Sequence, residues 1–403
     1  MDYTALKDIN NQSEIADVDS QHLEHLDKAL KNLWGLGRNI VLQWSPREHG
    51  IDVLVIPHYL LSEFVSSHEA GEDKKEKQSD SVIADIISGP RMTSAQELEH
   101  IAGILDCAIQ AVDLPFQIGE DLSTEIIEAL IKRYSISYVD DRAVALFDIV
   151  EFTLYSTLDQ VTQLNSLAYS MNAAYAKMLE NNIKINFARS TTGDGFYIWN
   201  RDRSMQANIN LYHFMHLVLA DNAIARSKSS KNTTPLLRTA FQVAGHYEFY
   251  QAKGLDPTIY SYIVGDVTID LARMIEQAEP GQILVGDFRV PMPDQKANRI
   301  IKSNSLKFID NAHATLSSLE GLVLSDEQIE SIKCYLTGDK MDNDQFGIHK
   351  FRIKDKHDKY RTVFNAKVNI YRGQAEPIYL GLQTSDLGNF SSTGKEFVDP
   401  DLN

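Results

Sequence analysis

The stretch that decides the fold of this chain is Leu146-Phe147-Asp148-Ile149-Val150-Glu151-Phe152-Thr153. It completes a run from residue 135 in which apolar side chains partly alternate, and this period of two predicts a β-strand that ends near Asp148. Two later stretches carry related chemistry: Thr192-Gly193-Asp194-Gly195-Phe196-Tyr197 and Gly265-Asp266-Val267-Thr268-Ile269-Asp270-Leu271-Ala272-Arg273. Asp148 near the end of the first strand, Asp194 in the Gly-flanked turn and Arg273 at the end of the third stretch are the kinds of group that proteins use to hold metal-bound phosphates.

The residues around these stretches predict a layered α/β core. An apolar stripe from Leu158 to Met178 predicts a helix after the first strand, and residues 184–190 and 196–199 predict a hairpin with Asp194 at its tip. The next elements expected are a helix at 204–226, strands at 236–244 and 259–264, a helix at 271–278 and a strand at 282–285. Strand, helix, two strands, helix, strand is the order of a ferredoxin-like α/β sandwich, here with an extra helix and strand.

The regions on either side of this core predict three parts of the chain. Residues 1–134 are expected to form a mostly helical accessory or dimerisation region, with helices at 17–32, 94–112 and 123–134, short strands at 39–44 and 51–56, and a solvated loop at 69–80. Residues 135–385 are expected to form the core domain, extended by helices at 301–319 and 325–336 and by strands at 350–353 and 362–371 around a charged turn. Residues 386–403 are expected to be a loose tail.

Composition excludes several classes of protein. The net charge of -17 over 403 residues opposes general binding to nucleic acid or to anionic membranes, so a polyanion has to meet a local basic pocket. The two cysteines, Cys107 and Cys334, lie in helix-like patterns and predict buried free thiols, not a disulfide scaffold or a zinc site. The N-terminus has no signal-peptide pattern and no apolar run reaches bilayer length, which predicts a cytoplasmic protein.

Two carboxylates at one end of a sheet can hold two divalent cations, which neutralise a triphosphate and activate a hydroxyl. Asp148 and Asp194 suit that task together, although a strand-end Asp is often only a cap and Gly-Asp-Gly is a common hairpin turn. His213 and His216 lie about one helical turn apart, but no third ligand accompanies them, so we interpret them as core or surface residues.

In this order of elements, the motifs resemble the catalytic domain of class III nucleotide cyclases, whose pattern is an Asp in Phe-x-Asp-Ile-x-x-Phe-Thr and a second Asp in a Gly-Asp turn. Leu146 stands at the first Phe, and the resemblance covers about residues 138–286. It implies Mg2+ or Mn2+, two per site, at Asp148, Ile149 and Asp194. It also implies that Arg273 stabilises the transferring phosphate and that Lys354, or alternatively Lys356, binds phosphate.

Departures from the family pattern bear on the substrate. Ser190 stands where adenine-using members have a Lys, and Tyr262 where they have an Asp, so these two residues and Ile269 are the candidate base-binding and substrate-binding positions. A Tyr in place of a small acid favours a smaller pyrimidine ring over a purine. The chain is thus similar to the Pycsar cyclases, bacterial antiphage enzymes that make cyclic CMP or cyclic UMP. Ile269 replaces a ribose-orienting Asn, for which Asp270 is a possible substitute.

The resemblance also implies a homodimer with shared active sites, in which the metal-binding aspartates of one subunit face Arg273, Lys354, Ser190 and Tyr262 of the other. The expected reaction converts a nucleoside triphosphate, UTP or CTP, to its 3',5'-cyclic monophosphate and pyrophosphate. Two alternatives remain: an adenylate or guanylate cyclase, and a catalytically dead nucleotide-binding sensor motivated by Ile269.

Overall fold

The computed structural model describes residues 17–33, 40–59, 83–229, 231–250, 261–294, 299–324, 326–340 and 347–398. The described residues form two compact units, the first running up to Val139 and including those between 247 and 263, the second containing residues 140–246 and those from Val264 onward. The predicted loop at 69–80 lies outside the described residues.

The first unit is built on an antiparallel sheet in the order β1-β2-β3. Its labelled elements are, in chain order, α2 (Asp17–Asn32), β1 (Ile40–Arg47), β2 (Gly50–Ile56), α5 (Ala95–Ile104), β3 (Ile109–Asp113) and α6 (Thr124–Lys132). Helices α2 and α6 share a hydrophobic core with one face of this sheet, and α5 shares a core with the other face. This part of the chain is therefore a sheet between helices.

The strands expected at 39–44 and 51–56 are confirmed as β1 and β2, whereas the third strand of the sheet, β3, was not predicted. The helix expected to reach residue 112 begins after the capping residue Ser94 as predicted, but it ends at Ile104, and strand β3 follows it. Cys107 accordingly lies after the helix, where it is a half-buried free thiol.

The second unit carries the predicted core. Its elements are β4 (Ile136–Ile149), α7 (Thr157–Glu180), β5 (Phe187–Thr191), β6 (Gly195–Asn200), α8 (Met205–Lys228), β7 (Leu237–Tyr250), β8 (Ser261–Val264), α9 (Asp266–Gln277), β9 (Ile283–Gly286), β10 (Arg289–Asp294), β11 (Arg299–Asn304), α10 (Ser305–Thr315), β12 (Val323–Leu324), β13 (Glu327–Leu336), β14 (Ile348–Lys354), β15 (Tyr360–Arg372), β16 (Ile378–Leu380) and β17 (Ser392–Val398). Strands β4, β7 and β8 run across the boundaries between the two units.

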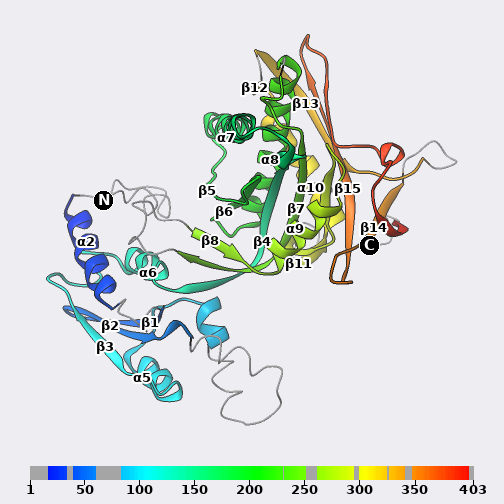
Figure 1. The fold of residues 1–403 in the computed structure, drawn as a ribbon. Helices are drawn as coiled ribbons and strands as arrows, with labels where there is room; N and C mark the ends of the chain where they lie inside the picture. Colours follow the sequence, from blue (N-terminus) through cyan, green and yellow to red (C-terminus); the bar gives the residue numbers. More distant parts are fainter. Residues whose placement is uncertain are drawn as a thin grey trace. The chain divides into compact units, whose positions relative to one another are not determined.

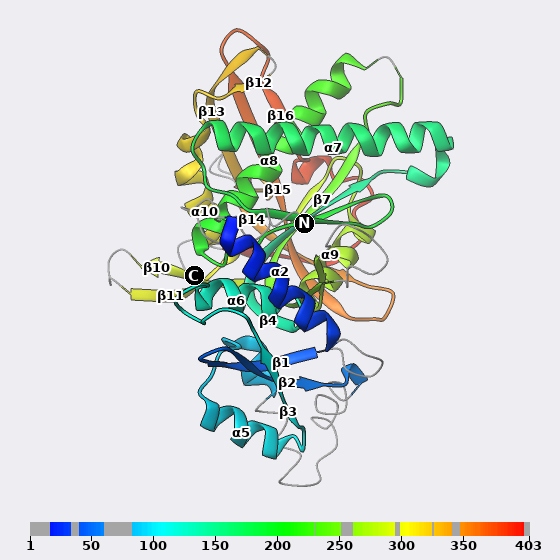
Figure 2. The same ribbon diagram turned by 90° about the vertical axis from the view of Figure 1, so that its left-hand side faces the viewer.

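The sheet confirms the predicted α+β fold. Its central strands lie in the order β7-β4-β6-β5, with α7 between β4 and β5 in the chain and α8 between β6 and β7 (Figure 1). This is the ferredoxin-like order, because the fourth strand pairs beside the first and the third lies between the first and the second. Beyond β7 the sheet continues through β9, β15 and β13. Figure 2 shows α7 as one long helix with α8 beside it, and the two pack together.

Alternation of side chains decides which face of the sheet carries the candidate site. On β4, Ala143, Ala145, Phe147 and Ile149 belong to the hydrophobic core shared with α7, α8 and α10. Asp148, between Phe147 and Ile149, therefore points to the opposite face. Helix α9 lies on that opposite face: the Tyr197 hydroxyl of β6 donates a 3.1 Å hydrogen bond to the Thr268 carbonyl of α9. We call this side of the sheet the α9 face.

Several C-terminal expectations were wrong. The helix predicted at 325–336 is strand β13, whose register with β15 shifts between Ile329 and Ser331. That irregularity places the buried residues Ile329 and Ile332 three apart, which imitates helical spacing. Cys334 therefore lies on a strand. The helix predicted from residue 301 begins at Ser305, after strand β11, and the predicted loose tail contains β17, which pairs with β14.

Candidate active site

Asp148 and Asp194 are adjacent because of strand pairing. Asp148 is paired with Gly195 across β4 and β6, and the amide nitrogen of Ile149 donates a 3.0 Å hydrogen bond to the carbonyl of Asp194. Gly195 permits this approach, since a Cβ atom there would lie 1.9 Å from the Phe147 carbonyl oxygen. Asp148 is buried, with 7% exposure, whereas Asp194 is partly exposed at the tip of the hairpin.

Arg238, on β7, forms an ion pair with Asp148. Its Nε and Nη2 atoms lie 2.9 Å and 2.5 Å from the same oxygen of Asp148, Oδ2. Burial raises the pKa of the Asp148 carboxyl, Arg238 opposes that effect, and the nearby charge of Asp194 adds to it. Arg238 is not among the site residues predicted from sequence. A signal existed, because Arg238 follows the apolar Leu237 in a predicted strand that is otherwise mostly apolar.

The donor set at this pair fits a divalent cation delivered with a nucleotide. Mg2+ in such sites is held by one or two carboxylates together with substrate phosphates, so a complete protein cage is not needed. Asp148 and Asp194 provide those carboxylates, and the Ile149 carbonyl is the third predicted ligand. Among the described residues, no group of three His, Cys, Asp or Glu side chains is placed to hold a metal ion by itself.

Tyr197 connects the carboxylate pair with Arg273. Its hydroxyl is bound to the Thr268 carbonyl of α9, the helix that carries Arg273. Burial raises the pKa of the Tyr197 hydroxyl, the charges of Asp148 and Asp194 add to that effect, and the charge of Arg273 opposes it. The two aspartates and Arg273 of one chain therefore all lie close enough to Tyr197 to shift the pKa of its hydroxyl.

Arg273 is mostly buried, with 17% side-chain exposure, and it faces two acidic residues. Its Nη1 atom lies 2.6 Å from Glu276, and its Nε atom lies 4.0 Å from Asp355. Lys354, at the end of β14, is more exposed and pairs with Asp358 at 2.8 Å. The alternative lysine, Lys356, lies 3.8 Å from Glu276. Arg273 and Lys356 thus share an acidic neighbour, which brings the charged turn to α9.

The three candidate substrate-binding residues differ in placement. Ser190 of β5 is paired with Tyr197 and so points to the α9 face. Ile269 is about half exposed on α9. Tyr262 belongs to the first unit, where its ring stacks on Phe249 with centroids 5.4 Å apart, and its contact with a base stays a prediction. Asp270, the possible substitute for the missing Asn, is already bound by Arg361 at 2.7 Å.

His213 and His216 are core residues, as expected. Both lie on α8, which is buried over most of its length. The Nε2 atom of His213 lies 3.0 Å from the Ala312 carbonyl oxygen, while neither ring nitrogen of His216 has a hydrogen-bond partner among the described residues. Burial lowers the pKa of His213 to about 4 and lowers the pKa of His216 well below its usual value.

We expect these histidines to make the fold acid-sensitive. In the unfolded chain these histidines bind protons near pH 6.5, whereas burial keeps them neutral in the folded chain. The contribution that they make to the free energy of unfolding is therefore fully present above pH 6.5 and is lost as the pH falls toward 4. For His213 the loss amounts to about 3 kcal/mol. His213→Gln should reduce the fall in unfolding free energy between pH 6.5 and 4, measured by urea denaturation. The exposed His313→Gln is the control, and an equal slope in both variants would contradict this account.

Comparison with known proteins gives structural likeness only. The sequence matches no protein-family model and no curated protein. Among solved structures, the adenylyl cyclase CyaB from P. aeruginosa is 12% identical over 63% of this chain and 100% of its own, with a TM-score of 0.35. The guanylate cyclase domain of RhGC from Catenaria anguillulae, in complex with GTP, is 12% identical over 59% and 100%, with a TM-score of 0.33. At these scores, the activity has to be argued from the site itself.

In the part of the chain that the structure describes, no helix combines the length and apolar character needed to cross a bilayer.

Proposed function

We propose that this protein is a nucleotide cyclase acting on a pyrimidine nucleoside triphosphate. The observation that carries the proposal is the pair Asp148 and Asp194, which strand register holds together on the α9 face within reach of Arg238. Two such carboxylates on a rigid sheet, with arginines close by, suit phosphoryl chemistry at a metal-bound triphosphate. The family motif around Asp148 and the Gly-Asp turn at Asp194 point to the same reaction.

In this reaction the ribose 3'-oxygen attacks the α-phosphorus. The bond between O3' and the α-phosphorus forms, the bond from the α-phosphorus to the bridging oxygen of the β-phosphate breaks, and pyrophosphate leaves while the hydroxyl proton passes to solvent. Bound Mg2+ or Mn2+, two ions per site, would neutralise the phosphates and lower the pKa of the attacking hydroxyl. Asp148, Asp194 and the Ile149 carbonyl would hold the metals.

The proposal gives Arg238 and Arg273 complementary tasks. Arg238 neutralises the buried Asp148 carboxylate in the absence of substrate. Its side chain is 26% exposed, so part of the guanidinium group is accessible to phosphate oxygens. Arg273 stabilises charge on the transferring phosphate, and Lys354 binds the other phosphates. Bidentate arginine contacts suit this role, because guanidinium groups match phosphate geometry. Each cation exchanges a carboxylate partner for phosphate oxygens.

The preference for UTP or CTP rests on Ser190 and Tyr262. Ser190 reaches the α9 face, and its hydroxyl can donate to or accept from either pyrimidine. The active form is a homodimer in which two chains complete two equal sites, and the cyclic nucleotide serves as a signal in bacterial antiphage defence, as the likeness to Pycsar cyclases suggests. The net charge of -17 opposes nucleic acid as a partner.

Incubation of the purified protein with ATP, GTP, CTP and UTP separately, each with Mn2+, tests the activity and its base preference. We expect pyrophosphate release from UTP or CTP to exceed release from either purine nucleotide by at least about tenfold, because a pocket narrowed by one aromatic side chain discriminates by 1 to 3 kcal/mol. Release from ATP or GTP alone would contradict the pyrimidine preference and leave a purine cyclase.

A nucleotide-binding sensor without catalysis is the second candidate. It is favoured by the exposed apolar Ile269 at the position of a ribose-orienting Asn and by the engagement of Asp270 with Arg361. A sensor would bind one of the four nucleotides in calorimetry and release no pyrophosphate from any of them. Pyrophosphate release that depends on Asp148 would exclude it.

A further inference from the structure

Outside the predicted catalytic residues, the strongest polar feature of the second unit is a bridge between the charged turn and α9. Asp355 follows Lys354 in the turn between β14 and β15, and its side chain is only 3% exposed. Its Oδ1 atom accepts hydrogen bonds from the amide nitrogens of His357 at 2.8 Å and Lys359 at 3.0 Å. One buried carboxylate therefore fixes the path of the turn that carries the lysines.

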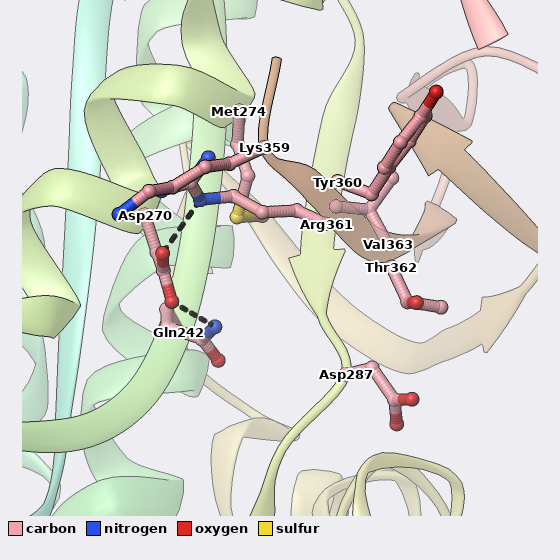
Figure 3. A pocket seen from close by; sticks show the side chains of 9 residues that line it. All are labelled: Gln242, Asp270, Met274, Asp287, Lys359, Tyr360, Arg361, Thr362 and Val363. Carbon is pink, nitrogen blue, oxygen red and sulfur yellow. Dashed lines mark hydrogen bonds and ion pairs between the residues drawn. The ribbon is translucent and has the colours of Figure 1, made fainter. Parts of the chain in front are cut away.

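Arg361 connects this carboxylate with α9. Its Nη1 atom lies 2.5 Å from Oδ2 of Asp355, and its Nε atom lies 2.7 Å from Oδ1 of Asp270 on α9. Figure 3 shows Arg361 directed at Asp270, with the amide of Gln242 on the other side of that carboxylate at 3.4 Å. The guanidinium group thus links the turn to the helix through two ion pairs.

The bridge reaches the predicted catalytic arginine through the same oxygen. Oδ2 of Asp355, which accepts from Arg361, also lies 4.0 Å from Nε of Arg273, a nitrogen for which the described residues provide no hydrogen-bond partner. Burial, which alone would raise the pKa of Asp355, is outweighed by hydrogen bonds from the turn amides and from Arg361, and the pKa is lowered to about 2. Asp355 is therefore a carboxylate across the whole working range of pH.

We infer that Asp355 and Arg361 are positioning residues that hold Arg273 and Lys354 in place for the triphosphate. The inference rests on the proposed function and extends it, because the family resemblance assigns a role to neither residue. Two loosely held cations would lose side-chain and backbone entropy on binding phosphate, and the bridge removes part of that cost before substrate arrives. Arg361 and Asp270 also line a cavity of about 330 Å³. Water can therefore occupy the space that a shorter side chain would leave at either position.

The test compares Asp355→Asn with Arg361→Lys and with the control Lys350→Gln. Lys350, also on β14, forms a 3.0 Å ion pair with Asp287 that does not touch Arg273. For Asp355→Asn we expect kcat with the best nucleotide to fall about tenfold or more and KM to rise about fivefold, because Arg273 acts mainly in the transition state while Lys354 also binds phosphate in the ground state. Arg361→Lys keeps the charge and should retain an intermediate kcat, while Lys350→Gln should match the wild type.

A second arm separates this inference from the proposed function. Calorimetry with inorganic tripolyphosphate measures phosphate binding without any reaction. Asp355→Asn should weaken this binding at least fivefold relative to the wild type and to Lys350→Gln, which is about the effect of one charge-assisted contact. If the wild type releases no pyrophosphate from any nucleotide, the proposed function fails and this arm still decides the inference. Unchanged tripolyphosphate affinity in Asp355→Asn, or an equal loss in Lys350→Gln, would overturn it. If Asp355→Asn does not fold, Arg361→Lys provides the same comparison.

Discussion

Asp148→Asn is expected to reduce pyrophosphate release by roughly 100-fold or more, because it removes the buried charge on which metal binding depends. The amide keeps the size of the side chain, so packing between β4 and β6 is retained. The same carboxyl predicts a pH effect of known sign. Burial raises its pKa, so its charge and the activity should be lost at a higher pH than for an ordinary aspartate as the solution is acidified.

The control for this substitution is Asp52→Asn in the first unit. Asp52 pairs with Arg47 at 3.0 Å, so this variant also breaks an ion pair between arginine and aspartate. Neither residue of this pair is a predicted site residue. It should retain wild-type turnover. Equal activity of Asp148→Asn and the wild type, with both folded by circular dichroism, would show that Asp148 is not a metal ligand.

Mixing two inactive variants should restore activity if sites are shared between subunits. Asp148→Asn leaves Arg273 intact, and Arg273→Gln leaves Asp148 intact, so each mixed dimer regains one complete site of two. Random exchange makes half of the dimers mixed, and about one quarter of wild-type activity is therefore expected from the symmetry of the assembly. The measurement is pyrophosphate release after the two variants are unfolded and refolded together.

If each site is completed within a single chain, mixing the two variants restores no activity. The Arg273 and Asp148 of one chain both act on the environment of Tyr197, so a site completed within a single chain makes a different prediction. In that case the mixture stays as inactive as the separate variants. Refolded wild-type protein is the control for recovery, and size-exclusion chromatography establishes that the mixed sample contains dimers.

The central fold could be predicted from sequence because its strands and helices have strong periodic patterns. The hairpin from Phe187 to Asn200, with Asp194 in its turn, and the starts of the helices expected from 94 and 123 agree with the structure. The strand β13 could not be predicted, because its shifted register produces helical spacing. Strand β17 is missed for another reason: its side chains are mostly exposed, so no apolar alternation marks it.

The site could be predicted only in part, for a related reason. Asp148 and Asp194 lie next to apolar strands and a Gly-rich turn, which are local signals. Arg238 and Arg361 are important because of partners 90 or more residues away, in both cases carboxylates on other elements. Such pairs depend on tertiary contacts, and neither arginine lies within a recognisable motif. The structure therefore adds the charge partners that the sequence could not assign.

Identification of the reaction product tests the central claim most directly. After incubation with Mn2+ and the preferred nucleotide, mass spectrometry should detect the 3',5'-cyclic monophosphate, and phosphorus NMR should show pyrophosphate in an equal amount. Asp148→Asn should yield neither compound. A nucleoside diphosphate with inorganic phosphate, or bound nucleotide recovered unchanged, would contradict the assignment of this protein as a nucleotide cyclase.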